Sequence, residues 1–220
     1  MIDPDDGNNK KIRVLLVDDH AVVRAGYSAL LKNTDCIEVV AEAENGNSAI
    51  KIFTDVHPDV VIMDLSLPGI GGLDAMRRIL ARDPHARILV FSMHEDIAFV
   101  EQALQAGACG YITKSSAPHV LVEAVRRIAA GDIYMDGEIA QRMAFQKVRG
   151  RDTPFAHLST REFEIFCLLA EGLSAQDISR RLSLSYKTVA NYSTQIRNKL
   201  NVDTNAELTR LAIRHGLVKA

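Results

Sequence analysis

The chain contains the stretch VVIMDLSLPG at residues 60–69, and the rest of the chain is arranged around it. Four apolar side chains lead to Asp64, and Pro68 and Gly69 follow it closely, which predicts a buried strand over residues 60–63 that ends in a turn. Ligands of an open parallel α/β sheet bind in the crevice outside the carboxyl ends of the strands. Asp64 is therefore placed to face a binding site, although an aspartate that caps a helix or forms a turn gives the same local pattern.

Strands and helices alternate on both sides of this stretch, along residues 11–131. Apolar runs predict strands at residues 11–17, 37–43, 60–63, 88–91 and 110–113. Apolar side chains at helical spacing predict helices at residues 20–32, 45–56, 73–82, 96–106 and 118–131. Each crossover helix returns the next strand in the same direction, so the prediction is an α/β fold with a five-stranded, doubly wound parallel sheet.

Four of the five predicted strands end on polar side chains that would meet at one edge of the sheet. These side chains are Asp18 and Asp19, Asp64, Ser92 and Lys114. Three carboxylates in one crevice repel one another unless a cation lies between them, and oxygen ligands suit Mg²⁺. With that charge neutralised, the Asp64 carboxylate can attack a phosphorus atom while Ser92 and Lys114 contact the phosphoryl oxygens. The added charge would draw both side chains inward and bias a two-state loop.

Residues 11–131 resemble a response-regulator receiver domain, which has a flavodoxin-like fold. The resemblance is carried by VLLVDDH at 14–20, VIMDLSLPG at 61–69, FSMH at 91–94 and GYITK at 110–114. It implies that Asp64 accepts a phosphoryl group and that Asp19, Asp64 and the backbone carbonyl of Ser66 hold Mg²⁺, with Asp18 supporting the metal through water.

The resemblance also implies a switch formed by Ser92, Lys114 and the aromatic Tyr111. The alternative for Tyr111 is an ordinary aromatic residue of a strand, which the resemblance makes the less favoured interpretation. Gly71 departs from the pattern, because receiver domains often carry an acid or an amide there. This departure affects a loop and leaves the chemistry of the carboxylates untouched.

Two other phosphate-related classes fit the first domain poorly. A flavodoxin-like FMN protein shares the sheet, but its first loop needs hydroxyls and glycine, and Asp18 and Asp19 would repel a phosphate there. A phosphatase of the haloacid-dehalogenase type has a second acid two residues after its nucleophile on the first strand, where this chain has His20. No second catalytic constellation appears, so an enzyme is not predicted beyond slow phosphotransfer to and from Asp64.

The flanking and connecting segments differ from the predicted domains. Residues 1–10 are polar and acidic and are predicted to be a disordered tail. Residues 132–156 are predicted to be a linker with a short helix at 137–147, in which Ile139, Met143 and Phe145 pack inward, followed by a flexible link, VRGRDTP.

Residues 157–220 are predicted to form an all-α domain of four helices. Ser159 and Glu162 make a capping box at the start of the first helix, and the last helix covers residues 205–215. Between them, a short helix, a three-residue turn and a long helix at residues 186–200 give the helix-turn-helix arrangement, whose second helix enters the DNA major groove.

The period of the long helix separates an inner face from an outer one. The inner positions are Val189, Ser193, Ile196 and Leu200, and the outer positions are Lys187, Asn191, Thr194 and Asn198. The outer stripe offers donors and acceptors and no acid. A merely solvated polar face would have the same composition, but the preceding turn favours base-edge and phosphate contacts.

This second part resembles the LuxR-type helix-turn-helix domain, so the whole chain resembles a two-component response regulator of the NarL/FixJ type. The resemblance rests on LSTREFEIFCLLAEGLS at 158–174 and KTVANYSTQIRNKLNV at 187–202. It implies base contacts from Ala190, Asn191 and Thr194 and backbone contacts from Lys187, Thr188 and Lys199. Ala190 and Tyr192 replace the commoner Lys and His, so the operator sequence cannot be borrowed from relatives.

Charge and composition fit this assignment. From Phe155 onward nine Lys and Arg face six Asp and Glu, a net charge of +3, which leaves −5 for residues 1–154. Three widely separated cysteines suit buried thiols better than a disulfide or zinc framework. No apolar run approaches the ~20 residues that cross a bilayer, so the expectation is a cytoplasmic protein with no membrane partner.

The predicted function is therefore a DNA-binding response regulator. A sensor histidine kinase or a phosphotransfer protein would supply the phosphoryl group, and a homodimer would bind double-stranded promoter DNA at two half-sites, assembled through the receiver or the last helix. The competing class is a regulator or assembly protein that uses a receiver fold without phosphorylation. The complete set of Asp18, Asp19, Asp64, Ser92 and Lys114 argues against that class.

Overall fold

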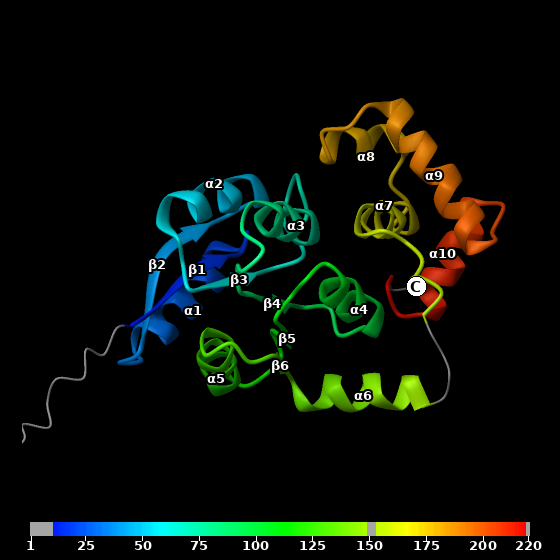
Figure 1. Ribbon diagram of the computed structural model, residues 1–220. Coiled ribbons are helices and arrows are strands. Elements are labelled where there is room, and N and C mark those ends of the chain that lie inside the picture. The colour runs from blue at the N-terminus through cyan, green and yellow to red at the C-terminus, as the bar shows by residue number, and fades with distance from the viewer. Residues whose placement is uncertain (1–10, 149–152, 219–220) are drawn as a thin grey trace, which may run out of the picture.

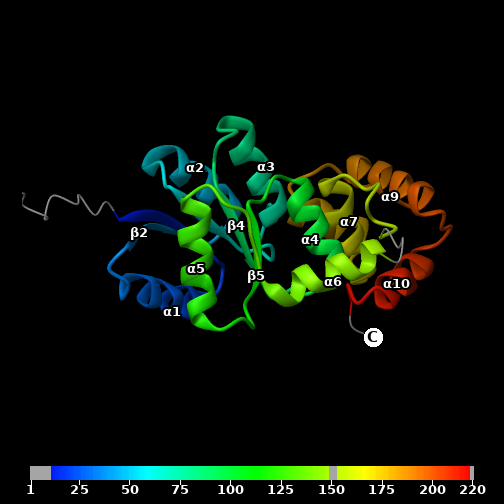
Figure 2. The ribbon, with the colours of Figure 1, turned by 60° about the horizontal axis from the view of Figure 1, so that its bottom comes forward.

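The computed structural model describes residues 11–148 and 153–218. The predicted disordered tail, residues 1–10, lies outside the described residues, as do residues 149–152 of the predicted flexible link. Within the described ranges, no helix is both long and apolar enough to cross a membrane. Figures 1 and 2 show a central sheet wrapped by helices, with a second group of helices, α7 to α10, beside it.

The central sheet is parallel throughout and has the strand order β2-β1-β3-β4-β5-β6. The first five strands agree with the predicted ones to within one residue: β1 Ile12–Val17, β2 Ile37–Ala43, β3 Val60–Met63, β4 Ile88–Ser92 and β5 Gly110–Thr113. The chain enters the sheet at β1, runs outward to β2, and then crosses back to β3 on the other side of β1. The carboxyl ends of β1 and β3 therefore flank the switch point of the topology, where sheets of this kind bind ligands.

Helices cover both faces of the sheet, as the crossover rule requires (Figure 1). On one face lie α1 Ala21–Lys32 and α5 Pro118–Ala129, and on the other lie α2 Gly46–Val56, α3 Gly72–Arg82 and α4 Ile97–Gln105. Alternate strand residues serve the two faces. Val61 and Met63 join the core under α2 to α4, whereas Val60 and Ile62 join the core under α1 and α5.

The prediction of five strands was wrong, because the described residues form six. The extra strand, β6 Tyr134–Met135, pairs in parallel with β5 at the edge of the sheet. Two residues are too few to give a periodic pattern, and only the pairing with Gly110 and Tyr111 makes them a strand.

The helix predicted in the linker is present as α6 Gly137–Val148. Ile139 is buried and Met143 packs against the core, as expected. The expectation for Phe145 was wrong, since 57% of its surface is exposed.

The C-terminal helices match the predicted arrangement: α7 Thr160–Ala170, α8 Ala175–Arg181, α9 Tyr186–Leu200 and α10 Asn205–Arg214. The capping box of α7 is formed, with Ser159 Oγ accepting from the Glu162 amide and the Glu162 carboxylate accepting from the Ser159 amide. The turn between α8 and α9 places Ser183 in the left-handed region at φ 54°. Four residues, 182–185, separate α8 from α9, one more than the predicted turn of residues 183–185, because α8 ends at Arg181.

The second group of helices packs directly onto the first domain through α7. The Gly71 amide, at the start of α3, donates to Glu164 Oε1 in α7 over 3.0 Å, and Arg161 lies 3.8 Å from Asp74. The buried Gln102 of α4 donates through Nε2 to the carbonyls just before α7, those of Phe155 and Leu158. One continuous apolar cluster extends from the α2–α4 side of the sheet into α7, α8, α9 and α10. We call this the docked arrangement.

Candidate functional site

Asp18 and Asp64 meet at the switch point because they follow β1 and β3, which are hydrogen-bonded neighbours. Each residue has only 2% of its surface exposed. The backbone holds them there, since the Asp64 amide donates to the Val17 carbonyl over 3.0 Å. The expected convergence of these strand ends is therefore present in the structure.

Lys114 joins the two carboxylates from the end of β5. Its Nζ lies 2.6 Å from Asp18 Oδ2 and 2.7 Å from Asp64 Oδ2, and its side chain is 6% exposed. Burial alone would lower the pKa of Lys114, but the hydrogen bonds to the two carboxylates outweigh it and raise the pKa above its ordinary value. Lys114 is consequently a cation at neutral pH and offsets the charge of the two buried acids.

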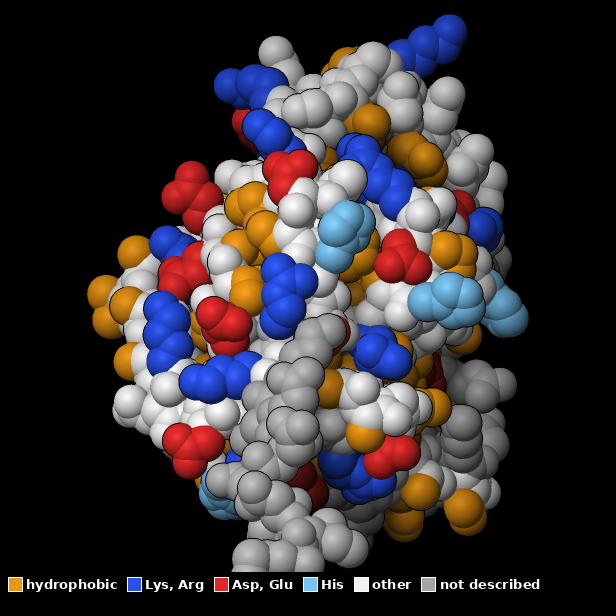
Figure 3. Space-filling model, turned by 60° about the vertical axis from the view of Figure 1, so that its left-hand side comes forward, with side chains coloured by type: hydrophobic (Ala, Val, Ile, Leu, Met, Phe, Trp, Pro, Cys, Tyr) orange, Lys and Arg blue, Asp and Glu red, His pale blue; other side chains and the backbone are white. Residues whose placement is uncertain are grey.

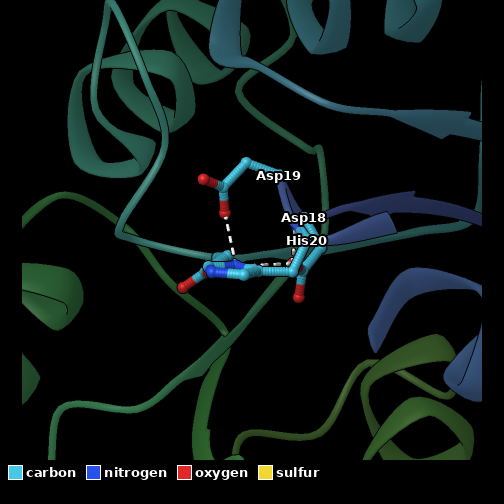
Figure 4. Close-up of side chains that lie close together, drawn as sticks. Asp18, Asp19 and His20 are labelled. Atoms are coloured by element: carbon cyan, nitrogen blue, oxygen red, sulfur yellow. Dashed lines mark hydrogen bonds and ion pairs between the residues drawn. The ribbon is translucent and has the colours of Figure 1, made fainter. Parts of the chain in front are cut away.

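Asp19 extends this cluster toward solvent together with His20. Figure 4 shows the Asp19 carboxylate pointing to the His20 ring, and His20 Nδ1 lies 2.8 Å from Asp19 Oδ1. This contact lacks the alignment of a hydrogen bond, so Asp19 Oδ1 is buried without a hydrogen-bond donor among the described residues. One ligand atom from each of Asp18, Asp19, His20 and Asp64 lies within 4.8 Å of the others. The cluster therefore has an acceptor that a bound cation would satisfy.

The predicted switch residues lie on the adjacent strands. Ser92, the last residue of β4, is fully buried, and its Oγ accepts from the His94 amide over 3.3 Å. Tyr111 of β5 is also fully buried, and its hydroxyl donates to the His94 carbonyl over 2.7 Å. Burial raises the pKa of Tyr111, so it remains a neutral donor.

His94 and the side chain of Ser66 belong to this site although the sequence did not single them out. His94 Nε2 lies 3.1 Å from Ser66 Oγ, and the Ser66 amide donates to Asp64 Oδ1 over 3.3 Å. Burial lowers the pKa of His94. The available signal was position: His94 ends the FSMH motif and Ser66 follows Asp64 by two residues.

A second candidate site is the outer face of α9. Val189, Ser193 and Ile196 are buried against the other helices, while Lys187, Asn191 and Thr194 are exposed. The predicted inner and outer faces are thereby confirmed. The docked arrangement leaves this outer face exposed, because the contacts with the first domain are made by α7, by the segment before it and by Gly216 after α10.

The remaining residues predicted to contact DNA have more varied surroundings. Thr188 and Ala190 are partly buried, and Thr188 Oγ1 lies 2.8 Å from Ser185 Oγ at the start of α9. Lys199 is engaged within the domain, since its Nζ contacts Glu162 Oε2 at 2.6 Å and the His157 carbonyl at 3.2 Å. Burial would raise the pKa of Glu162, but these contacts and the helix cap lower it. Lys199 therefore helps to hold α9 against α7.

Surface charge distinguishes the two ends of the molecule. On the face of the first domain that Figure 3 brings forward, Lys and Arg alternate with Asp and Glu. By contrast, the outer residues of α9 include Lys187 and no carboxylate. Because no carboxylate on α9 would repel a polyanion, the α9 face is the better candidate for a nucleic-acid contact.

A parallel α/β domain with two buried carboxylates and a lysine at its switch point, joined to a helix-turn-helix domain, defines the class of DNA-binding response regulators. Comparison with protein families agrees with this class. The response regulator receiver domain matches residues 14–126, and the bacterial regulatory proteins of the luxR family match residues 156–212. The chain therefore belongs to the response regulators of the NarL/FixJ type, with a LuxR-type output domain.

Similar proteins match over nearly the whole chain. The response regulator UvrY of Escherichia coli K12 is 43% identical over 211 residues, which cover 95% of this chain and 97% of that protein. The response regulator GacA of Pseudomonas aeruginosa is 40% identical over 95% of this chain and 99% of its own length. Among solved structures, RcsB of Salmonella enterica serovar Typhimurium, bound to promoter P1flhDC in the presence of the phosphomimetic BeF3−, has a TM-score of 0.71 and 26% identity and covers 92% of this chain and 98% of its own.

Proposed function

We propose that Asp64 accepts a phosphoryl group from a phosphohistidine of a sensor histidine kinase or a phosphotransfer protein, and that this controls binding of promoter DNA by α9. The observation that carries the proposal is the bridge from Lys114 to Asp18 and Asp64 at the switch point. It holds the Asp64 carboxylate at the carboxyl end of β3, with the Lys114 ammonium group beside it. Such a carboxylate is a nucleophile next to a group that can neutralise phosphoryl oxygens.

The same cluster fits Mg²⁺. Hard oxygen donors are available from Asp18, Asp19 and Asp64, and the buried Asp19 Oδ1 without a hydrogen-bond donor is an acceptor that a cation would satisfy. We propose Asp19, Asp64 and the Ser66 carbonyl as ligands, with Asp18 acting through water. When bound, Mg²⁺ would supply charge neutralisation on the transferring phosphoryl oxygens.

Each side chain of the site has its own role in the proposed phosphoryl transfer. An Asp64 carboxylate oxygen forms the bond to phosphorus while the phosphorus–nitrogen bond to the donor imidazole breaks and that imidazole leaves with the electron pair. Lys114 neutralises charge on the phosphoryl oxygens, and the Ser92 hydroxyl donates a hydrogen bond to one of them. The buried Tyr111 responds to the movement of Ser92. The protein thus performs phosphotransfer to its own side chain. Hydrolysis of the product is slow: water attacks phosphorus, the bond from phosphorus to the Asp64 oxygen breaks, and inorganic phosphate and the free carboxylate result.

For the output, we propose that α9 enters the major groove, where Ala190, Asn191 and Thr194 contact bases. Lys187, Thr188 and Lys199 are proposed to contact the backbone, and Lys199 would have to leave Glu162 to do so. The RcsB structure on promoter DNA supports a duplex as the ligand. A single helix-turn-helix module buries little surface, so we propose a homodimer on two half-sites, acting in the bacterial cytoplasm where promoters are found.

The acceptor is tested by labelling with a small phosphodonor such as acetyl phosphate in the presence of Mg²⁺. Asp64→Asn should keep the fold and abolish labelling, because the amide oxygen is a poor nucleophile. Asp55→Asn, at an exposed position in α2, is the matched control and should be labelled like the wild type. Undiminished labelling of Asp64→Asn would reject Asp64 as acceptor, and loss of labelling without Mg²⁺ would support the metal. A wild type that is never labelled would favour the phosphorylation-independent regulator instead.

A further inference from the structure

We propose that His94 couples the state of Asp64 to the docked DNA-binding domain. This inference rests on the proposed function, because it assumes that Asp64 carries the phosphoryl group. His94 lies in the loop between β4 and α4, between the carboxylate cluster and helix α7. It does not touch the reacting atoms in this structure and is therefore a positioning residue.

Three hydrogen bonds connect His94 to groups around Asp64. Its Nε2 lies 3.1 Å from Ser66 Oγ, its backbone amide donates to Ser92 Oγ over 3.3 Å, and its carbonyl accepts from the Tyr111 hydroxyl over 2.7 Å. Ser66 is in turn bound to Asp64 through its backbone amide. A displacement of any of these three side chains is therefore transmitted directly to His94.

The ring of His94 connects to the second domain. It stacks on Phe99 of α4 with a centroid distance of 3.8 Å and an interplanar angle of 14°, and Phe99 meets Phe163 of α7 edge-on at 5.1 Å and 83°. Phe99 and Phe163 are both buried. Aromatic contacts depend on distance and angle, so a shift of the His94 ring alters the packing of α7.

A phosphoryl group on Asp64 would act on this connection from one end. It adds acceptor oxygens and negative charge. The hydroxyls of Ser66 and Ser92 are the nearby donors bound to His94, and both would have to move toward Asp64 to reach those oxygens. Closely packed cores respond to such shifts by changing between discrete arrangements. The expected result is a weaker contact between Phe99 and Phe163, and with it a change in the docked arrangement.

The test uses full-length protein and a duplex that the phosphorylated wild type selects from a random pool. We define the coupling ratio as the Kd for this duplex without phosphodonor divided by the Kd with it. His94→Phe keeps an aromatic ring on Phe99 but removes Nε2, and Ser66→Ala removes the partner hydroxyl. Coupled sites usually change each other's affinity by about fivefold or more, and we expect a wild-type coupling ratio of that size. Each variant should reduce this ratio at least about twofold. The double variant should lose no more than either single one, because both remove the same hydrogen bond.

The control is Met93→Ala, a neighbouring residue whose side chain is 70% exposed, and it should keep the wild-type coupling ratio. The labelled fraction of each variant is measured in parallel, and the Kd is referred to labelled molecules. If labelled His94→Phe and Ser66→Ala both keep the wild-type ratio, the role of His94 is overturned and the role of Asp64 stands. If wild-type protein is not labelled, or its labelled and unlabelled forms bind DNA equally, the proposed function fails and the coupling fails with it.

Discussion

Among single residues, Lys114 supplies the positive charge that balances the buried carboxylates of the cluster. Its ammonium group is the shared partner of Asp18 and Asp64, and all three side chains are nearly inaccessible to water. Removing one partner of a buried ion pair leaves a charge without compensation. The cost is therefore far larger than for an ion pair on the surface.

Lys114→Met should lower the free energy of unfolding by about 3–5 kcal/mol at pH 7, measured by urea unfolding in EDTA. The effect has a defined pH dependence. The pKa of Lys114 is raised in the folded protein, so its contribution is complete below its ordinary value of 10.5 and is lost as pH rises through the higher folded value. The difference in the free energy of unfolding between wild type and Lys114→Met should therefore become smaller above about pH 10.5. Lys114→Arg, which keeps the charge, is the control, and a difference independent of pH would contradict this account.

The sequence could predict which strand ends carry Asp18, Asp64, Ser92 and Lys114, because strand direction alone brings them to one edge. The position of His94 at the end of the FSMH motif placed it near the site, but its spacing could not show that its ring stacks on Phe99. That contact depends on how the β4–α4 loop turns, which is a property of the folded chain.

At the scale of elements, helix α9 behaves as its period predicts. Its inner side chains are buried and its outer ones are free to meet DNA in the docked arrangement. The element that could not be predicted from the sequence is too short to show a periodic pattern of apolar residues. Strand β6 is two residues long, and its existence follows only from pairing with Gly110 and Tyr111.

Two substitutions on the outer face of α9 should separate specificity from affinity. Asn191→Ala should cost about 1–3 kcal/mol of discrimination at one base position, because a side-chain amide can recognise an adenine edge. Lys187→Ala should weaken binding to all sequences alike and reduce the slope of log K against log salt by about one. Gel-shift titrations with matched and mismatched duplexes measure both. Unaltered preference in Asn191→Ala would refute its assignment as a base contact.

At the scale of the whole molecule, the two domains approach so closely at Gly71 that a side chain there would collide with the other domain. A Cβ at Gly71 would lie 2.5 Å from Glu164 Oε1, and the Gly71 amide is the donor to that same carboxylate oxygen. A larger residue at position 71 would therefore require the Glu164 carboxylate to move. The sequence showed this departure from the receiver pattern, but it could not show the contact with Glu164, which lies 93 residues further along the chain.

Gly71→Ala should therefore weaken the docked arrangement, because the Glu164 carboxylate must move to make room for the methyl group. Small-angle X-ray scattering should show a larger radius of gyration for this variant than for the wild type. Gly26→Ala in α1 is the matched control, since a Cβ there meets nothing within 4 Å. Equal radii for all three proteins would mean that the Glu164 side chain yields without opening the contact.

One apolar cluster extends from the sheet into α7 to α10. Through it, we expect the state of Asp64 and the binding of DNA at α9 to be energetically coupled. Such coupling is reciprocal. If a phosphoryl mimic at Asp64 increases the affinity for promoter DNA by some factor, bound promoter DNA increases the affinity for the mimic by the same factor. A duplex bound at α9 should thus tighten the retention of beryllofluoride at Asp64 by the same factor, which a titration with and without DNA can measure. Promoter DNA would then favour the phosphorylated form of the protein at equilibrium.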